Sequence, residues 1–347
     1  MIKKSIITLL LGSVVVYANS LEDAKISGEI RSGTVQIENN LGKRHSTLSL
    51  GGSLGIKTAP IGGISLATTF FTTNPLFGKD KEEMFLGSQN RGYSIAGEAY
   101  IEANLGKNQI KAGRQIVDTP YIDSDDIGMI PNSYEGYTIT NKDLSNTTIF
   151  LAKLNRWSGF DAPIKDEFTD MQDSNKAVWV KGVIYEGINN MTLQAWQYKL
   201  ENNSLNYFEI GYETKQFNLA WQYSTQDNSN KVFGLLAKIN FGNLLFTTAY
   251  NKVSGEVING FGGGPFFTSS QDHTIEGTQN QKALLIGAEY VYNKFTMGLT
   301  YVDFDKNENE TDYILSYDFN DKMSFDLIYS NMYSDGKMTK AFAKYKF

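Results

Sequence analysis

The chain has 347 residues, no cysteine, a net charge of −6 and 13% aromatic residues. The acidic balance argues against nucleic acid as a partner, and the lack of cysteine excludes disulfide bonds as a stabilising device. No apolar run reaches the about 20 residues that a membrane-spanning helix needs, which excludes a helical membrane protein.

The N-terminal residues 1–18 have the features of a secretory signal peptide. Lys3 and Lys4 form a positive region, residues 6–16 form a short apolar core, and Ala18 occupies the small-residue position before a cleavage site. The apolar core is too short for a membrane anchor. We therefore expect cleavage near Ala18, which leaves a single-domain mature chain, residues 19–347, with a net charge of about −8 because two lysines are removed.

Apolar and polar residues alternate throughout the mature chain. The runs from Phe217 to Tyr223 and from Met323 to Tyr329 are examples, and such runs are typical of β-strands with one apolar face. No helical period is convincing after residue 18. Eighteen segments follow the strand pattern: 24–37, 46–58, 62–73, 92–105, 108–117, 133–141, 146–156, 177–187, 190–200, 204–214, 217–226, 231–241, 243–253, 281–292, 294–303, 311–319, 322–332 and 337–347.

The connections between these segments also alternate. Those after even-numbered segments are tight, and those after odd-numbered segments are mostly longer, the longest being 74–91, 118–132, 157–176 and 254–280. Outer-membrane barrels have short periplasmic turns, longer external loops and an even number of strands. All six prolines fall in predicted connections, as a closed ladder requires. The sequence therefore predicts an all-β fold, a transmembrane antiparallel β-barrel of about 18 strands.

The C-terminus supports this prediction. The last segment alternates and ends on Phe347, which resembles the terminal aromatic by which outer-membrane barrels are recognised for insertion. We expect the protein in the outer membrane of a Gram-negative bacterium, in contact with outer-membrane lipid. A barrel of this size is too wide for its own side chains to fill, so we expect a water-filled lumen that passes small hydrophilic solutes and ions without a cofactor.

Strand alternation assigns several charged residues to the lumen. Arg31 on the first segment, Glu98 on the fourth and Lys111 on the fifth face inward, and Lys153 and Lys181 do so less clearly. Arg114 falls on the lipid side, where a charge is costly at mid-membrane. We expect either a bulge that turns Arg114 inward or a position near the rim of the barrel.

The connection 118–132 is acidic and cannot be a strand, because it contains two prolines. It is either a solvated surface loop or a constriction loop folded into the lumen. In the second interpretation its carboxylates oppose basic wall residues and create a transverse field. The acidic residues outnumber their basic partners, which predicts a weak cation preference; the acidic set is Asp118, Asp123, Asp125 and Asp126, and the basic set is Arg31, Lys111, Arg114 and Lys153.

The stretch from Gly113 to Gly136 (GRQIVDTPYIDSDDIGMIPNSYEG) resembles the third-loop region of OprD-type porins, and residues 259–267 (NGFGGGPFF) are similar to another loop of that family. The resemblance implies eighteen strands, a third loop that forms the constriction, and a row of basic residues opposite an electronegative patch. It also implies passage of small organic solutes such as amino acids or carboxylates. The residues that match the family pattern are Pro120, Asp123, Pro131, Glu135 and Gly136. Position 128 departs from it, because glycine stands where the pattern has arginine, and this makes the constriction more acidic.

Other functions have weaker support. A barrel enzyme would have to use His45 or His273, and neither lies beside a nucleophile motif. A surface adhesin would need larger loops. The acidic residues 123–126 lack the glycine and the distal glutamate of a Ca²⁺ loop, so no metal is expected. A monomer and a homotrimer both stay open, because lipid-facing and subunit-facing stripes are equally apolar.

Overall fold

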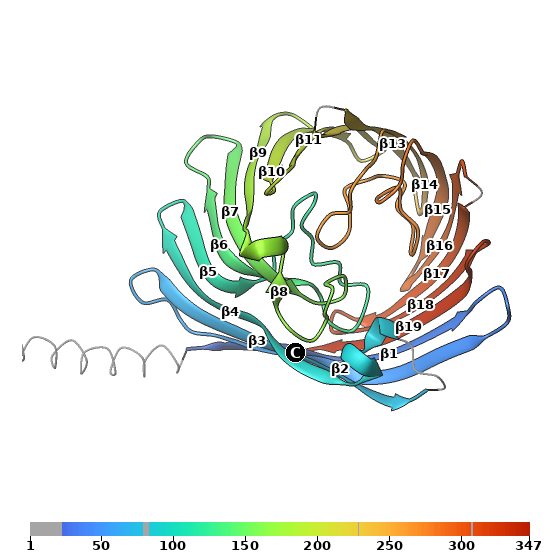
Figure 1. Cartoon of the computed structure of the whole chain (residues 1–347), viewed down its shortest axis with the longest axis horizontal. Helices are drawn as coiled ribbons and strands as arrows, with labels where there is room; N and C mark the ends of the chain where they lie inside the picture. Colours follow the sequence, from blue (N-terminus) through green and yellow to red (C-terminus); the bar gives the residue numbers. More distant parts are fainter. Residues whose placement is uncertain (1–22, 79–82, 228, 307) are drawn as a thin grey trace, which may run out of the picture.

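A computed structural model describes residues 23–78, 83–227, 229–306 and 308–347. Each long strand pairs antiparallel with the next, and the last pairs with the first, so the sheet closes into a barrel (Figure 1). The strands are β1 Lys25–Glu38, β2 Arg44–Lys57, β3 Ile64–Phe77, β4 Tyr93–Leu105, β5 Asn108–Gln115, β6 Ser133–Asn141, β7 Thr147–Ser158, β8 Thr169–Asp170, β9 Val178–Ile188, β10 Met191–Lys199, β11 Ser204–Glu213, β12 Phe217–Gln226, β13 Asn230–Phe241, β14 Leu244–Ser254, β15 Lys282–Tyr292, β16 Phe295–Phe304, β17 Glu308–Asn320, β18 Met323–Met332 and β19 Gly336–Lys346.

Eighteen of these strands form the barrel wall, which confirms the predicted fold class. β8 is a two-residue strand that pairs with the end of β7, while β7 and β9 are direct neighbours in the wall. The wall strands lie within four residues of the predicted bounds at both ends. Within the described residues, the helical content is three short 3₁₀ turns, η1 Glu83–Phe85, η2 Ser88–Asn90 and η3 Asp173–Asn175.

The placement of one proline differs from the prediction. Pro75 lies inside β3, not in a connection. The last pair between β3 and β4 is Thr73 with Tyr93, so Pro75 has no β4 partner that would need its missing N–H. The register between β2 and β3 also shifts beside it, between Leu48 and Ser49. Pro75 is therefore tolerated at the free end of a strand, as proline is at edges and bulges.

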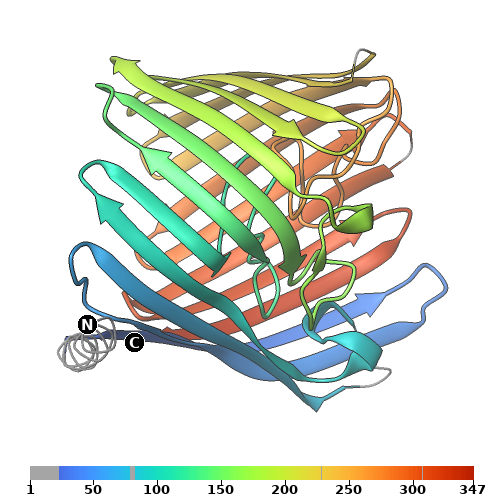
Figure 2. The same cartoon turned by 60° about the vertical axis from the view of Figure 1, so that its left-hand side comes forward.

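The barrel closes between β1 and β19 over ten residue pairs. Gly28 and Phe347 exchange two backbone hydrogen bonds, of 3.1 and 3.0 Å, at the very end of the chain. The C-terminus lies at the end of the barrel that carries the short turns (Figure 2). Closure removes free sheet edges, which lipid cannot satisfy with hydrogen bonds.

No helix in the described part of the chain is long and apolar enough to cross a membrane. The predicted signal peptide, residues 1–18, lies outside the described residues.

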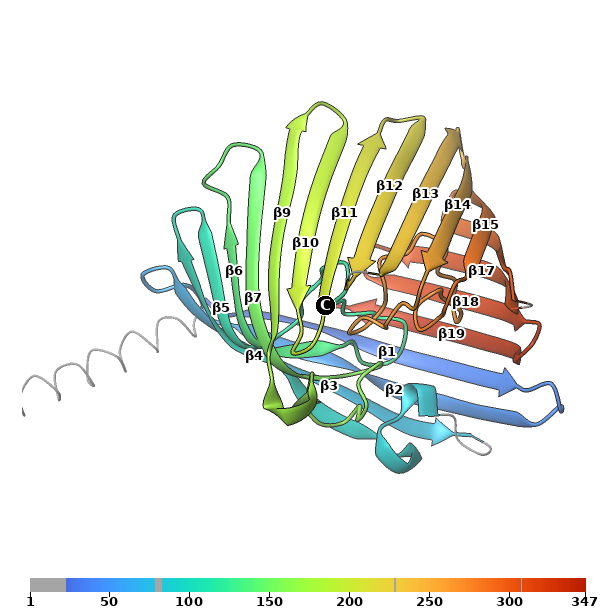
Figure 3. The same cartoon turned by 45° about the horizontal axis from the view of Figure 1, so that its top comes forward.

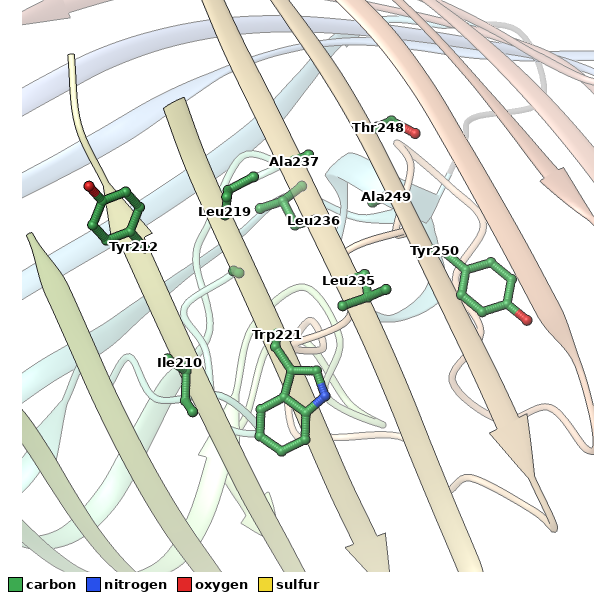
Figure 4. A pocket seen from close by; sticks show the side chains of 11 residues that line it. Ile210, Tyr212, Leu219, Trp221, Leu235, Leu236, Ala237, Thr248, Ala249 and Tyr250 are labelled. Carbon is green, nitrogen blue, oxygen red and sulfur yellow. The ribbon is translucent and has the colours of Figure 1, made fainter. Parts of the chain in front are cut away.

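The outer face of the barrel is apolar. Ile26, Leu219, Leu235, Ile286 and Leu299 point outward and are between 46 and 66% exposed. The outward side chains of β11–β14 surround a depression of about 490 Å³ above the small side chain of Ala237 (Figure 4). Aromatic pairs gather at the short-turn end, as expected of an interfacial girdle; they include Phe241–Phe246, Tyr290–Tyr292, Phe295–Tyr317 and Tyr345–Phe347.

Three of the long external connections are named here by their order along the chain: the third loop (116–132), the fourth loop (159–177) and the seventh loop (255–281). The third and seventh loops fold into the ring of strands and meet inside it (Figures 1 and 3). The buried core consequently lies inside the barrel, between loops and wall. Tyr121, Tyr134 and Trp157 belong to one of its clusters, and Phe85 and Met129 belong to the other.

Candidate functional site

The third loop crosses the lumen and is fixed to the far wall by Tyr121. The side chain is fully buried among Tyr198, Tyr207 and Phe266, with ring centroids 5.5 to 6.3 Å apart and edge-to-face geometry. Its hydroxyl forms a 2.6 Å hydrogen bond with Ser224 on β12. The first half of the loop is therefore anchored in an aromatic socket opposite its own strands.

The second half of the third loop is fixed to β1 by Arg31. The guanidinium donates two hydrogen bonds to the Asp126 carboxylate, at 2.6 and 2.8 Å, and a third to the Gly128 carbonyl at 2.7 Å. Its Nε donates to Glu29 at 2.6 Å. Two-pronged arginine–carboxylate contacts are strong and directional. Arg31 and Asp126, which sequence reasoning placed on opposite sides of the lumen, thus bind each other.

Gly128 has no room for the arginine that the resemblance leads us to expect. A Cβ at this position would lie 2.7 Å from Cδ2 of Phe160 in the fourth loop. The Arg31 guanidinium nevertheless lies against the Gly128 carbonyl. A basic group therefore occupies this part of the loop, but it comes from the barrel wall.

The third and seventh loops are joined by backbone hydrogen bonds. Ile122 and Phe261 form a parallel bridge, the Phe261 N–H donates to the Tyr121 carbonyl at 2.8 Å, and the Asp123 N–H donates to the Phe261 carbonyl at 3.2 Å. The Tyr134 hydroxyl on β6 donates to the Asp123 carbonyl at 2.7 Å and also to the Phe261 carbonyl. The two loops therefore form one barrier inside the barrel.

Carboxyl groups from three loops meet at this barrier. Burial, together with the charge of Asp161 in the fourth loop and a hydrogen bond shared with it, raises the pKa of Asp125 to about 7. Burial also raises the pKa of Glu276 in the seventh loop to about 8 and raises the pKa of Asp123. Asp125 is thus about half protonated near neutral pH, so the cluster carries less negative charge than its composition indicates.

Two of the third-loop carboxylates are held by backbone N–H groups. Asp118 accepts from Ser124 N at 3.0 Å, and Asp123 accepts from Asp125 N at 2.7 Å. Within the described residues, neither carboxylate lies within 4.0 Å of a basic side chain. Asp118 is exposed, and it lies with Asp123 on the side of the loop that faces β9–β11.

Glu98 and Lys111 lie on the inner wall of β4 and β5. Glu98 accepts a 2.7 Å hydrogen bond from Thr69. The Lys111 ammonium lies 4.9 Å from the ring centre of Tyr100 and opposite Glu102, which also accepts from Lys57 at 2.7 Å. Lys111 therefore lies among wall carboxylates, and no contact joins it to the third-loop acids in the described structure.

Arg114 lies near the C-terminal end of β5, against the fourth loop. It stands one residue before the end of β5, donates to Glu135 at 3.0 Å, and lies 4.3 Å from the ring centre of Phe168 in the fourth loop. Arg114 thus has both an ion-pair partner and an aromatic cover. Arg114 accordingly pairs with β6 and not with the acidic loop.

The placement of Lys153 and Lys181 corrects the sequence analysis. Their strand neighbours Ala152 and Val180 are buried in the interior cluster that contains Tyr121 of the third loop (the third-loop cluster). Because side chains alternate along a strand, both lysines lie on the outer face. The Lys153 ammonium lies 5.4 Å from the ring centre of the half-exposed Trp179, as expected of an interfacial side chain. The two lysines therefore do not line the lumen.

His273 fastens the seventh loop to the wall. Its Nδ1 lies 2.8 Å from Glu310 on β17, and its Nε2 lies 3.0 Å from Asp335 between β18 and β19. The backbone N–H groups of Asp272 and His273 donate to the two oxygens of Glu310, at 3.0 and 2.9 Å. The hydrogen bond to Glu310 is the main cause that raises the pKa of His273 to about 9, so the ring is charged at neutral pH.

Sequence reasoning missed Asp161, Glu209, Glu276 and the anchoring function of His273. Asp161, Glu276 and His273 lie in long connections that carry no strand period, and Glu209 is one polar residue in a regular alternation. Their proximity depends on how the loops fold inward, which no local pattern in the sequence indicates. Only the inward orientation of Glu209 could have been predicted, from the alternation of apolar and polar residues along β11.

The chain is similar to known proteins in sequence pattern and in fold. Residues 76–323 match a family described as outer membrane porin, OprD family. A BenF-like porin from Pseudomonas fluorescens Pf-5 superposes with a TM-score of 0.83 at 15% identity, covering 94% of this chain and 99% of that one. Pseudomonas aeruginosa OpdK, solved with vanillate, superposes with a TM-score of 0.81 at 14% identity and the same coverage.

Pseudomonas aeruginosa OccK2 (OpdF), solved with glucuronate, superposes with a TM-score of 0.80 at 14% identity, covering 95% of this chain and 99% of that one. No curated protein sequence matches the chain. At these identities the solved structures establish the shared fold, and the family match covers most of the chain.

Proposed function

Because the chain belongs to the OprD family of outer-membrane porins, we propose that its lumen is narrowed by the acidic third loop and favours cations among the small hydrophilic solutes that it passes. The protein is a porin of the Gram-negative outer membrane. Solutes cross it by diffusion through the water around the joined third and seventh loops. The observation that carries the proposed preference is the pairing pattern of the charges inside the barrel.

Three basic side chains of the lumen are paired with carboxylates, whereas Lys111, Lys238 and Lys340 have no carboxylate within 4.0 Å among the described residues. Arg31 contacts both Glu29 and Asp126, Lys57 contacts Glu102 at 2.7 Å, and Lys344 contacts Asp326 at 3.3 Å. Asp118, Asp123, Glu98 and Glu209 have no basic partner within 4.0 Å in the described part of the chain. A low-dielectric wall strengthens the field of such unpaired charges, so anions meet a barrier.

The test is the reversal potential of the purified full-length protein in a planar bilayer under a KCl gradient. Asp118 and Asp123 are changed together to Asn, which keeps the oxygen that accepts each backbone N–H and removes the charge. We expect a cation-directed potential for the wild type and a loss of roughly twofold or more in cation preference for the double variant. The variant Asp321→Asn, in the exposed turn between β17 and β18, serves as the control and should leave selectivity unchanged.

Two results would overturn the cation proposal in different ways. An anion-directed potential in the wild type would make the basic wall dominant. Equal selectivity of the wild type and the Asp118/Asp123 variant would remove these two residues from the eyelet. Asp126 is left unchanged in this experiment because its removal would also expose the charge of Arg31.

A substrate-selective channel for amino acids or small carboxylates is the second candidate. It is supported by Lys238, which together with Glu289 and Asp312 lines a cavity of about 410 Å³ between the seventh loop and β13–β17. Lys238 has no carboxylate within 4.0 Å among the described residues. Two similar structures were solved with the carboxylates vanillate and glucuronate. Liposome uptake of glutamate that depends on Lys238, and exceeds uptake of an equally sized neutral solute, would favour this candidate.

The assembly state and the lack of an enzymatic activity belong to the same proposal. Members of the family are porins, which are channels rather than enzymes, and OprD-type porins are usually monomers. We favour a monomer over a homotrimer for this chain on that ground. Light scattering of the detergent-solubilised protein distinguishes the two, because their protein masses differ threefold.

A further inference from the structure

One cavity inside the barrel combines acidic and aromatic side chains. It measures about 380 Å³ and lies between the first half of the third loop, the seventh loop and the wall of β9–β11. Asp118 and Asp123 line it from the loop, and Glu209, Trp196 and Tyr207 line it from the wall. Its volume falls in the range of small-molecule sites.

The charge of this cavity differs from that of the other two lumen cavities. No Lys, Arg or His lines it among the residues that the structure describes. The cavity beside β1 and β2 contains Arg31 together with Glu29 and Asp126, and the cavity beside β13–β17 contains Lys238. An anion would therefore be repelled from the β9–β11 cavity, whereas a cation would meet carboxylates without displacing a protein cation.

The wall side of the cavity is held in place by a chain of hydrogen bonds. Trp196 donates from its indole nitrogen to Gln194 at 2.8 Å, Gln194 donates to one oxygen of Glu209 at 3.0 Å, and Tyr207 donates to the other oxygen. Glu209 is thus fixed as an acceptor beside two large aromatic side chains. Carboxylates combined with aromatic side chains form the usual surroundings of bound ammonium and guanidinium groups.

We propose that this cavity is a binding subsite for small organic cations, ammonium or guanidinium compounds, and that the ligand need not carry a carboxylate. The inference rests on the proposed function, because the ligand reaches the cavity through the open lumen. It names the class of solute that the acidic eyelet retains during passage. A carboxylate on the ligand gains nothing here, since the cavity offers it no basic partner.

The test uses 1,4-diaminobutane as the probe on single channels of the full-length protein in a planar bilayer at 0.1 M KCl. We expect brief interruptions of the current whose frequency rises with the probe concentration. Glu209→Gln, which preserves the side-chain shape, should weaken the apparent affinity of the block roughly tenfold. The matched control is Glu213→Gln at the exposed short-turn end of the same strand, which should leave conductance and block unchanged.

The possible results separate the two proposals. A channel that conducts normally but shows no block by the diamine, or equal block in the wild type and Glu209→Gln, overturns the subsite and leaves the porin proposal standing. The subsite is also overturned if Glu213→Gln weakens the diamine block as much as Glu209→Gln does, or if butanoate blocks the channel as strongly as the diamine. The effect would then be unspecific. Folded protein without any conductance contradicts the open lumen itself.

Discussion

Arg31 decides where the second half of the third loop lies. Its side chain is 7% exposed and binds Asp126, Glu29 and the Gly128 carbonyl at once, so the loop cannot move away from β1 without breaking several charge-assisted hydrogen bonds. Because Asp126 is 45% exposed, water compensates part of that loss. The contact therefore fixes the position of the loop, and its removal should change the size of the pore more than the stability of the folded protein.

We expect Arg31→Gln to increase the mean single-channel conductance and to broaden its distribution. The change removes the ionic hydrogen bonds to Asp126, at a cost to loop anchoring of about 1.5–3 kcal/mol at most, and leaves Asp126 without its cation. Cation preference should rise at the same time, since a positive charge is lost from the lumen. Single-channel recording at fixed voltage measures both quantities.

The control for this variant is Arg44→Gln. Arg44 pairs with Glu38 at the exposed end of the β1–β2 hairpin, far along the strands from the third loop. If Arg31→Gln has the same single-channel conductance as the wild type and Arg44→Gln, the third loop is held in place by Tyr121 alone.

At the scale of single elements, the strands were predictable and the loops were not. Strand positions follow from alternation, which the membrane imposes on every crossing segment. Alternation did not settle which face of β7 and β9 turns inward. Ala152, Leu154, Val178 and Val180 are apolar because they pack on the third-loop cluster, whereas Lys153 and Lys181 lie outside. The apolar face of a wall strand can be assigned to the lipid side only where no loop packs against the inner face of that strand.

The loop contacts lay beyond prediction for a different physical reason. Tyr121 meets Ser224, Arg31 meets Asp126, and His273 meets Glu310, at separations of 103, 95 and 37 residues. Neither spacing nor composition links such pairs in one sequence. The resemblance to OprD-type porins predicted an inward third loop, but it did not indicate which residues hold that loop in place.

The seventh loop is an element whose attachment should depend on pH. His273 has its pKa raised from the ordinary value of about 6.5 to about 9, chiefly by Glu310. A raised histidine pKa means that the attached loop binds the proton more tightly than the free loop. Its contribution is complete below about pH 6.5 and is lost as the pH rises through about 9. The charged groups that act on the ring are Glu310, Asp335 and Asp272; nearby, Asp312 accepts from the Gln271 N–H, and Lys340 interacts electrostatically with Asp272.

We expect His273→Asn to release the seventh loop at neutral pH. Cleavage by chymotrypsin at Phe261, Phe266 or Phe267 should then be roughly tenfold faster than in the wild type, because charge-assisted hydrogen bonds to Glu310 and Asp335 are lost. Raising the pH from 7 to 10 should speed cleavage of the wild type relative to the variant, which removes the pH dependence of the protease itself from the comparison. His45→Asn, on β2, is the control, and a pH response in His273→Asn equal to that of the wild type would contradict the assignment.

At the scale of the whole molecule, the fold depends on few specific residues. The solved porins share 14–15% identity with this chain and still superpose over 94–95% of it. The bilayer requires strands of sufficient length, an apolar outer face and a closed ladder, and many sequences satisfy these conditions. The lumen is free of those requirements, which is why charge placement inside the barrel can differ between proteins of one fold.

This division between the two faces predicts opposite outcomes for neighbouring substitutions in β16. Leu299 points outward near the middle of the strand and is 47% exposed, whereas Thr300 lines the cavity beside the seventh loop. Leu299→Arg should destabilise the barrel by about 2–4 kcal/mol, the cost of a cation near the bilayer midplane. Thr300→Arg should fold with little loss of stability and shift ion selectivity toward anions, because its charge enters water.

Urea unfolding of both variants in phospholipid vesicles, followed by tryptophan fluorescence, measures the difference. The two residues are adjacent and receive the same side chain, so composition and strand propensity hardly differ between the variants. A larger destabilisation by Thr300→Arg than by Leu299→Arg would reverse the assigned faces of β16. Since each wall strand is hydrogen-bonded to two neighbours in register, reversing one would require reversing them all, and the acidic lumen that underlies the proposed cation preference would be lost with it.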